Sequence, residues 1–210
     1  FNAEDLVFNQ HNVVRLLFNS WFSESWVFSM HHFAKDYYEQ LTNKPCRLMP
    51  YCWSPTLLSK YVVENALDVT CNPAGYAGAL TLCCFEPNLN VTKTCQCPLL
   101  IMNRFYQLHP ERVHKCFLFC TKQMLERKSF KDYISFLQVC RDGKVEFYPR
   151  MAFPEILKQM KQKSLNPVMI GHQLYNDQNY LSLEALHLGY PLVHNSPSIE
   201  QMGKKDAIVT

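Results

Sequence analysis

From residue 79 onward, apolar residues follow two alternating patterns: short unbroken runs, and longer stretches at helical spacing. Strand-sized segments occupy residues 79–85, 115–120, 144–148, 167–171 and 191–194, and the apolar runs at 79–85 and 115–120 are typical of strands covered on both faces of a parallel sheet. The stretches at helical spacing occupy residues 89–108, 123–139, 153–163 and 177–188. Strands that alternate with helices in this way predict right-handed βαβ crossovers and an α/β fold with a Rossmann-like parallel sheet.

Local signals predict where several of these helices begin and end. Asn88 or Asn90 is expected to cap the start of the helix over residues 89–108. Pro154 suits the first turn of the helix over residues 153–163, where its missing N–H is harmless. Gly189, with a proline two residues later, is expected to end the helix over residues 177–188.

The first third of the chain predicts a separate, smaller unit. Residues 3–18 are amphipathic, and a strand at 26–30, a helix at 33–41 and a strand at 46–49 make one βαβ step of a preceding sheet. Residues 51–78 carry prolines and glycines without strong periodicity, as expected of a connector. We therefore expect the remainder of an N-terminal domain and a hinge over residues 1–55, a connector over 56–78, and a Rossmann-like domain over 79–210. The chain begins at Phe1 inside a helical pattern, which suggests a fragment of a longer protein.

Composition excludes several classes of protein. A net charge of +3 over 210 residues, with basic residues spread along the chain, does not favour a nucleic-acid partner. No apolar run approaches the roughly 20 residues of a membrane-spanning helix, and no signal segment opens the chain. Several of the ten cysteines lie inside apolar runs, where they are expected to act as small hydrophobes. We expect a cytoplasmic protein, with a cysteine-based metal site as a distant alternative.

Candidate ligand-binding residues follow the strands, because ligands bind at the carboxyl ends of parallel strands. Glu86-Pro-Asn88 follows the first strand of the sheet, and Lys93 is expected in the opening turn of the next helix. A helix N-terminus with a nearby lysine is a plausible diphosphate site, although a solvated lysine beside a capping asparagine explains the same residues. No Gly-x-Gly-x-x-Gly or Walker-type loop is present.

The densest polar cluster follows the fourth strand. It comprises His172, Gln173, Asn176, Asp177 and Asn179, with Glu184 on the apolar helix that follows. A partly desolvated carboxylate needs hydrogen-bond donors, which the paired hydroxyls of a ribose, a backbone amide or an arginine can supply. Arg150 follows the third strand, and His194, Asn195 and Ser196 follow the fifth. The polar residues after the first, fourth and fifth strands are expected along one crevice at the same edge of the sheet, and Arg150 could assist there unless it is a simple surface arginine.

These stretches carry a resemblance to a known family. Residues 172–196, which read His-Gln-Leu-Tyr-Asn-Asp-Gln-Asn-Tyr-Leu-Ser-Leu-Glu-Ala-Leu-His-Leu-Gly-Tyr-Pro-Leu-Val-His-Asn-Ser, resemble the donor-site segment of GT-B glycosyltransferases. The closest resemblance is to a sparsely characterised, mostly bacterial glycosyltransferase-like family. Phe-Glu-Pro-Asn-Leu-Asn-Val-Thr-Lys over residues 85–93 resembles the first strand-to-helix turn of that family, and Pro-Tyr-Cys-Trp-Ser-Pro over residues 50–55 resembles its hinge.

The resemblance implies a C-terminal nucleotide-sugar-binding domain that follows the remainder of an acceptor-side domain. Glu184 would bind the ribose of the donor and Lys93 its diphosphate. The further donor-site candidates are Asn88, Arg150, His172, Gln173, Asn176, Asn179, Asn195 and Ser196. Glycosyltransferases of the broad retaining group carry two glutamates eight residues apart, whereas position 176 here is asparagine, which leaves the stereochemical outcome open. His32 is the candidate acceptor-activating base.

The expected function is therefore transfer of a sugar from a nucleotide-sugar, such as a UDP-sugar, to a glycan, lipid or protein acceptor. No Asp-x-Asp pair is present, so the transfer is expected to need no metal, and no cofactor is expected beyond the donor itself. A nucleotide-sugar epimerase of the same architecture and a non-catalytic glycosyltransferase-like module are the alternatives.

Overall fold

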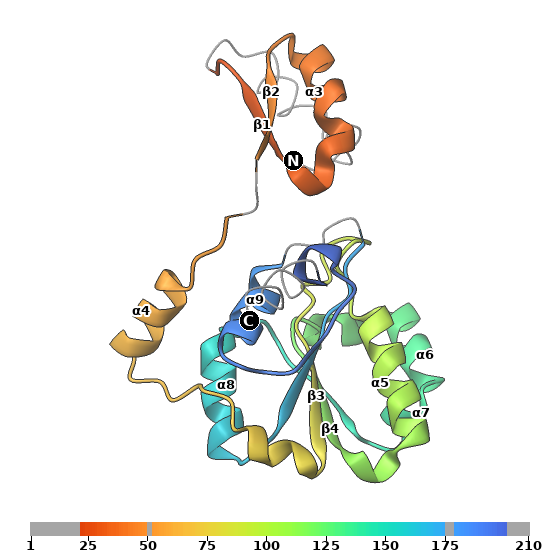
Figure 1. Cartoon of the computed structure of the whole chain (residues 1–210). Coiled ribbons are helices and arrows are strands. Elements are labelled where there is room, and N and C mark those ends of the chain that lie inside the picture. Colours follow the sequence, from red (N-terminus) through yellow and green to blue (C-terminus); the bar gives the residue numbers. More distant parts are fainter. Residues whose placement is uncertain (1–21, 50–51, 175–178, 201–210) are drawn as a thin grey trace. The chain divides into compact units, whose positions relative to one another are not determined.

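The computed structural model describes residues 22–49, 52–174 and 179–200 (Figure 1). The chain divides into two compact units, with the boundary between Cys52 and Trp53. The helix predicted over residues 3–18 lies outside the described residues. Each unit is considered by itself below.

The first unit is one parallel βαβ step, as the sequence predicts. Strand β1 (Ser25–Phe28) pairs in parallel with β2 (Cys46–Met49), in a register that sets Ser25 opposite Cys46. The connection consists of the 3-10 helix η1 (Ser29–Ala34) and helix α3 (Lys35–Thr42). The predicted strand over residues 46–49 is thus confirmed, and the predicted helix over residues 33–41 begins two residues later than expected.

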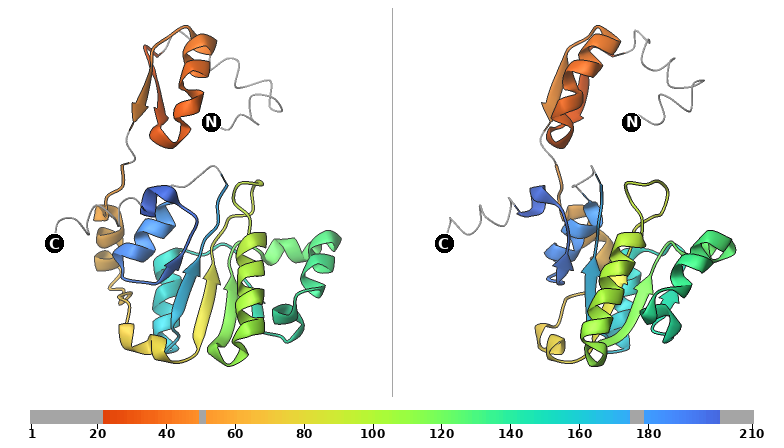
Figure 2. Two further views of the ribbon diagram at one scale, coloured as in Figure 1. Left: turned by 45° about the vertical axis from the view of Figure 1, so that its right-hand side comes forward. Right: turned by 90° about the vertical axis from the view of Figure 1, so that its right-hand side faces the viewer.

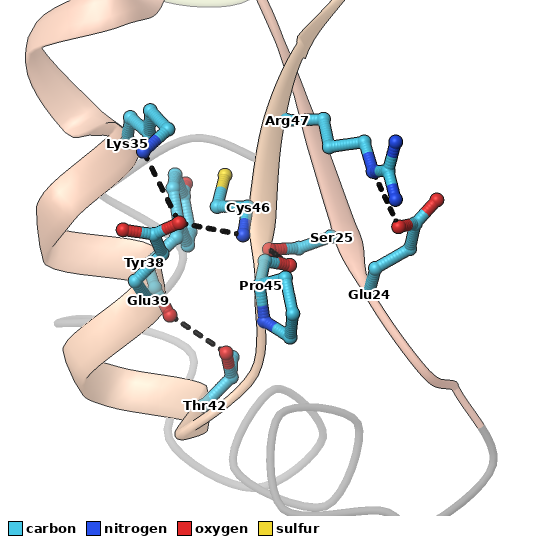
Figure 3. Close-up of polar contacts among 9 residues, drawn as sticks. All are labelled: Glu24, Ser25, Lys35, Tyr38, Glu39, Thr42, Pro45, Cys46 and Arg47. Atoms are coloured by element: carbon cyan, nitrogen blue, oxygen red, sulfur yellow. Dashed lines mark hydrogen bonds and ion pairs between the residues drawn. The ribbon is translucent and has the colours of Figure 1, made fainter.

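One carboxylate ties helix α3 to the start of strand β2. The Glu39 Oε1 atom accepts a hydrogen bond from the backbone N–H of Cys46 at 2.9 Å and lies 3.1 Å from the Lys35 ammonium (Figure 3). These two interactions, the first being the larger, lower the pKa of Glu39. Across the two strands, the Arg47 Nε atom lies 2.6 Å from a carboxylate oxygen of Glu24.

The second unit is built on a five-stranded parallel sheet. Its strands are β3 (Leu80–Cys84), β4 (Val113–Leu118), β5 (Val145–Phe147), β6 (Pro167–Ile170) and β7 (Leu192–Val193). They lie in the order β5-β4-β3-β6-β7, and every neighbouring pair is parallel. The chain therefore runs outward from β3 to one edge and returns to the other side of β3. This confirms the predicted Rossmann-like fold, with a reversal of strand order between β3 and β6.

Helices cover both faces of this sheet. One face carries α5 (Gln96–Leu108), α6 (Lys128–Ser135) and α7 (Gln138–Arg141), and the other carries α8 (Phe153–Gln162) and α9 (Tyr180–His187) (Figures 1 and 2). Alternate residues of β3 enter the two cores: Leu82 and Cys84 face α5, and Cys83 faces α8. Burial on both faces explains why β3 and β4 read as apolar runs, whereas β5 at the sheet edge carries Glu146 and is only partly buried.

The buried cysteines act as core hydrophobes, as expected. Cys83, Cys84 and Cys116 are fully buried. Burial raises the pKa of each thiol, to about 12 for Cys116. In the described part of the chain, no group of three or more histidine, cysteine or acidic side chains is arranged to hold a metal ion. No described helix has the length and apolar character needed to cross a membrane.

The helix predicted over residues 89–108 begins seven residues later than expected, at Gln96. Its N-cap is Cys95, so neither Asn88 nor Asn90 caps it, and Lys93 lies in the preceding loop. The apolar spacing was misleading because Leu89 and Val91 are 81% and 68% exposed. Pro98 gives the physical reason for the later start. It occupies the first turn of α5, whereas a helix that began at residue 89 would carry it in the interior.

The helix predicted over residues 123–139 is broken into three pieces. The 3-10 helix η4 (Lys122–Glu126) precedes α6 and α7, and the backbone is extended at Arg127 and Leu137, where the breaks fall. The breaks turn the chain back toward α5, where the Asn103 side chain accepts a hydrogen bond from the Val139 N–H at 3.1 Å. Val139 is fully buried there. Burial of apolar side chains thus overrides continuous helical hydrogen bonding.

The segment over residues 56–78, predicted to be a connector, contains regular structure and packs on the sheet of the second unit. It forms helix α4 (Thr56–Glu64) and the 3-10 helix η2 (Pro73–Ala77). Val69 is 1% exposed within the core beneath α8 and α9, and its carbonyl oxygen accepts a hydrogen bond from the Tyr190 hydroxyl at 2.8 Å. The boundary between the units therefore precedes this segment.

Gly189 ends helix α9 as predicted. Its φ is +80°, and the N–H groups of Gly189 and Tyr190 donate to the carbonyl oxygens of Leu186 and Ala185. This pair of hydrogen bonds is the Schellman arrangement, which requires a left-handed residue.

Substitution Gly189→Ala is expected to destabilise the protein by about 1 kcal/mol, because an L side chain is strained at positive φ. The added Cβ would meet only an ordinary contact, 3.5 Å from the Cys71 Cβ atom, so strain rather than a clash is the cause. Urea unfolding would measure the change. Gly78→Ala is the matched control, since Gly78 has φ −89°, and a loss as large as that of Gly189→Ala would contradict the explanation.

Candidate functional site at the carboxyl edge of the sheet

The loops that follow β3 and β6 meet where the strand order reverses. Lys93 and Gln173 form an isolated antiparallel bridge, and the Leu174 N–H donates to the Thr92 carbonyl oxygen at 2.9 Å. The two loops are thus joined by backbone hydrogen bonds as well as by the neighbouring strands. The predicted meeting of these strand ends is confirmed.

Glu86 lies buried between these loops, with only 2% of its surface exposed. One carboxylate oxygen accepts a hydrogen bond from the His172 N–H at 3.3 Å, and the other accepts one from the Gln173 side-chain amide at 3.0 Å. Burial raises the pKa of Glu86 to about 7, although these two hydrogen bonds and the positive charge of Lys93 oppose the shift. A buried carboxyl that titrates near neutral pH is typical of functional sites.

The loop after β7 is held against the same place. The Asn195 side chain accepts a hydrogen bond from the Gln173 N–H at 3.0 Å and donates one to the Gln173 carbonyl oxygen at 2.8 Å. Next to it, the His194 ring accepts a hydrogen bond from the Ser196 N–H at 3.1 Å, and the Ser196 hydroxyl accepts one from the Ile199 N–H at 3.2 Å. The ends of β3, β6 and β7 therefore converge.

Asn88 holds the loop in which Lys93 lies. Its side-chain amide donates to the carbonyl oxygens of Glu86 at 2.7 Å and Cys120 at 3.3 Å, and its oxygen accepts from the Cys95 N–H at 2.8 Å. Its backbone adopts φ +57°, a conformation that asparagine tolerates better than most residues. Asn88 therefore braces the loop between β3 and α5.

Helix α9 begins beside the same edge. Asn179 is its N-cap, with a side-chain oxygen that accepts from the Leu181 N–H at 3.1 Å. In the first turn, Ser182 is buried near Gly171, where a Cβ atom would lie 3.9 Å from its hydroxyl and 3.6 Å from the Glu86 carboxylate. Glu184 is half-buried, and burial raises its pKa. Among the described residues, its carboxylate has no hydrogen-bond or ion-pair partner.

Three candidates from the sequence lie apart from this cluster or outside the described residues. Arg150 follows β5 and is exposed. Asn176 lies outside the described residues. His32 belongs to the first unit, where its ring makes an edge contact with Phe33. The contacts that join the converging loops thus come from Lys93, His172, Gln173 and Asn195, together with Glu86.

The sequence placed Glu86 at the end of the first strand but gave it no role in donor binding, although a signal was present. It follows an unbroken apolar strand directly and precedes a proline, so its side chain starts at the end of a buried element. A carboxylate in that position needs donors from neighbouring loops. The sequence pattern alone could not identify those donors, since they come from the loop about 86 residues further along the chain.

Stacked aromatic rings support the same edge. Phe85 and Phe119, which follow β3 and β4, stack with ring centroids 4.6 Å apart, and Tyr148 stacks on Phe119 at 5.2 Å. Phe153 in the first turn of α8 packs edge-on against Phe85. These contacts fix the ends of three adjacent strands on the face opposite α5.

A cavity of about 370 Å³ lies at the other end of β6, near Pro167. Two of its polar side chains already have partners. The Tyr76 hydroxyl donates to the Pro167 carbonyl oxygen at 2.8 Å, and the Lys161 ammonium is paired with the Asp68 carboxylate. The carboxyl edge differs, because Lys93 and Glu184 each lack an ion-pair partner in the described part of the chain.

The fold and the site define an α/β protein of Rossmann-like topology with a charged cluster at the reversal of its strand order. A family model described as "Protein of unknown function (DUF2827)" matches residues 1–205, and the chain belongs to this family. No curated protein matches the chain, and no solved structure matches it.

The raised pKa of Glu86 predicts a pH-dependent contribution to stability. A carboxyl whose pKa rises from 4.5 when unfolded to about 7 when folded stabilises the fold below pH 4.5, and this contribution is lost as the pH rises through 7. Relative to Glu86→Gln, the wild type should therefore lose about 3 kcal/mol of unfolding free energy between pH 4.5 and 8.5. Urea unfolding of both proteins at each pH would measure the difference.

Glu111→Gln is the control for this measurement, because Glu111 is exposed at the amino end of β4. Its difference from the wild type should stay nearly constant with pH. A Glu86→Gln difference that is equally constant would contradict the assigned titration of Glu86.

Proposed function

We propose that this protein is a glycosyltransferase and that the carboxyl edge of its sheet binds a nucleotide-sugar donor. The observation that supports the proposal most directly is the meeting of the Lys93 and Gln173 loops where the strand order reverses. In open parallel sheets, this is the place where phosphorylated ligands bind. The proposal also rests on the sequence resemblance of residues 172–196 to the donor-site segment of GT-B glycosyltransferases.

Lys93 is the proposed contact for the diphosphate. Its loop precedes α5, and the carbonyl oxygen of Lys93 accepts a hydrogen bond from the Asn88 N–H at 3.0 Å, which fixes the backbone. The ammonium has no ion-pair partner among the described residues, so its charge is available to an anion. During transfer, negative charge develops on the leaving diphosphate, and a fixed cation lowers the energy of that state.

Glu184 is the proposed contact for the ribose. A half-buried carboxylate that has no partner among the described residues is a site for hydrogen-bond donors, and two ribose hydroxyls would supply them. Asn179 and Asn195 hold the helix start and the Gln173 loop, so we assign them to shaping the site. Direct contacts of the donor with Arg150, His172, Asn176 and Ser196 stay predictions.

The remaining parts of the proposal concern the acceptor and its activation. The role of His32, an exposed residue of the first unit, as the acceptor-activating base stays a prediction. The acceptor is a hydroxyl-bearing glycan, lipid or protein. We also propose that transfer needs no metal, because Lys93 meets the diphosphate charge, and that the protein works in the cytoplasm.

Donor binding is tested by thermal unfolding of the full chain with UDP-, GDP- and dTDP-sugars. A ligand present at about 100 times its Kd should add about 2.7 kcal/mol of stability. Glu184→Ala should weaken binding at least tenfold, because it removes hydrogen bonds to a charged group. The same variant should unfold at an equal or higher temperature without ligand, since the lost carboxylate has no partner in the part of the chain that the structure describes and alanine favours helices.

The matched control is Glu111→Ala, which removes an exposed carboxylate at the opposite end of the strands and should bind the donor as the wild type does. Stabilisation by no nucleotide-sugar at all would favour a non-catalytic module and refute the donor site. Stabilisation by a nucleotide-sugar followed by inversion of a sugar carbon, without transfer, would favour an epimerase.

A further inference from the structure

Glu86 and Lys93 interact electrostatically, so the site contains two opposite charges rather than one isolated cation. Glu86 is 2% exposed, and Lys93 is the cation whose charge acts on it among the described residues. The two side chains do not form a direct ion pair in the structure, so the Lys93 ammonium remains accessible to a second anion. An anion bound beside Lys93 would compete with Glu86 for the same positive charge.

The other ionisable groups around Glu86 leave it little compensation. Three thiols interact electrostatically with Glu86, those of Cys84, Cys95 and Cys120. Burial raises the pKa of each thiol, to about 12 for Cys95. These thiols are therefore neutral at physiological pH. His172 faces the carboxylate with its backbone N–H, and Gln173 with its side-chain amide. After the hydrogen bonds from Gln173 and His172, which lower the pKa of Glu86 more, the Lys93 charge is the further favourable interaction, and it is the one that a bound anion would oppose.

We propose that Glu86 takes up a proton when the diphosphate of a nucleotide-sugar binds beside Lys93, so that donor binding is coupled to proton uptake at the strand reversal. The inference rests on the proposed function. The proton comes from solvent and binds a carboxylate oxygen of Glu86, and no other bond forms or breaks. Once protonated, Glu86 no longer sets a buried negative charge against the negative diphosphate.

The coupling has a definite sign and size. The carboxyl titrates near pH 7 in the free protein, so a diphosphate that cancels the Lys93 charge raises its pKa further in the complex. For a rise of about one unit, roughly half a proton enters per donor bound at pH 7.5, and the donor binds about fourfold more weakly at pH 8.5 than at pH 7.0. Binding thus strengthens as the pH falls through the titration range of Glu86.

The experiment is isothermal titration calorimetry of the full chain with UDP-glucose, GDP-mannose or dTDP-glucose, whichever binds. At pH 7.5, the titration is repeated in buffers of different ionisation enthalpy. The diphosphate of a nucleotide-sugar is esterified at both ends and does not titrate in this range, so a dependence of the observed enthalpy on the buffer reports protons taken up by the protein. We expect uptake of about half a proton.

Glu86→Gln is the decisive variant. Its amide keeps the size of the side chain and can bond to the His172 N–H and, after rotation of the Gln173 amide, to Gln173. This variant should bind the donor as well as the wild type does or better, with an enthalpy independent of the buffer. His172→Gln is the matched control, because histidine is the other side-chain type in the site that titrates near neutral pH. It should retain the proton uptake.

The outcomes separate this inference from the proposed function. Donor binding by the wild type with a buffer-independent enthalpy overturns the proton coupling and leaves the donor site standing. Proton uptake that persists in Glu86→Gln and vanishes in His172→Gln also overturns it. Absence of binding by every nucleotide-sugar, to the wild type and to Glu86→Gln alike, overturns both.

Discussion

The arrangement of the carboxyl edge depends on how one buried carboxylate, Glu86, is satisfied. A charge or a polar group taken out of water must find hydrogen-bond donors within the protein. The loop after β6 can supply them, because β6 returns to lie beside β3. The His172 N–H and the Gln173 amide are those donors, and Asn195 in turn fixes the backbone of Gln173. Through the bridge to Gln173, the same network fixes Lys93.

The sequence was sufficient for the fold and for which strand ends meet, but not for the details of the site. Apolar runs and helical spacing predicted the five strands because burial on both faces leaves that pattern directly in the chain. The start of α5 was misjudged because Leu89 and Val91 imitate helical spacing while they point to solvent, and Pro98 was the signal that placed the start later. The buried role of Glu86 could not be predicted, because its hydrogen-bond partners are distant in sequence and no local pattern records such a contact.

The polar residues at this edge fall into two groups that sequence alone did not distinguish. The side chains of Asn88, Asn179 and Asn195 form hydrogen bonds with backbone groups of the surrounding loops. Lys93 and Glu184 have no ion-pair partner among the described residues. A residue with a complete set of hydrogen bonds stabilises the loop it holds, whereas an unpaired charge costs stability that only a ligand would recover. Unpaired charges are therefore the better guide to ligand contacts here.

The two unpaired charges also constrain the kind of ligand. Lys93 precedes α5 on one face of the sheet, and Glu184 lies on α9, which covers the other face. A ligand that engages both must cross the edge of the sheet and must present an anion on one side and hydrogen-bond donors on the other. A simple phosphate meets the first condition and lacks the second, and a neutral sugar has the reverse defect. A nucleoside diphosphate carries a diphosphate and ribose hydroxyls in one molecule, so both conditions are compatible with the proposed nucleotide-sugar, which contains that unit.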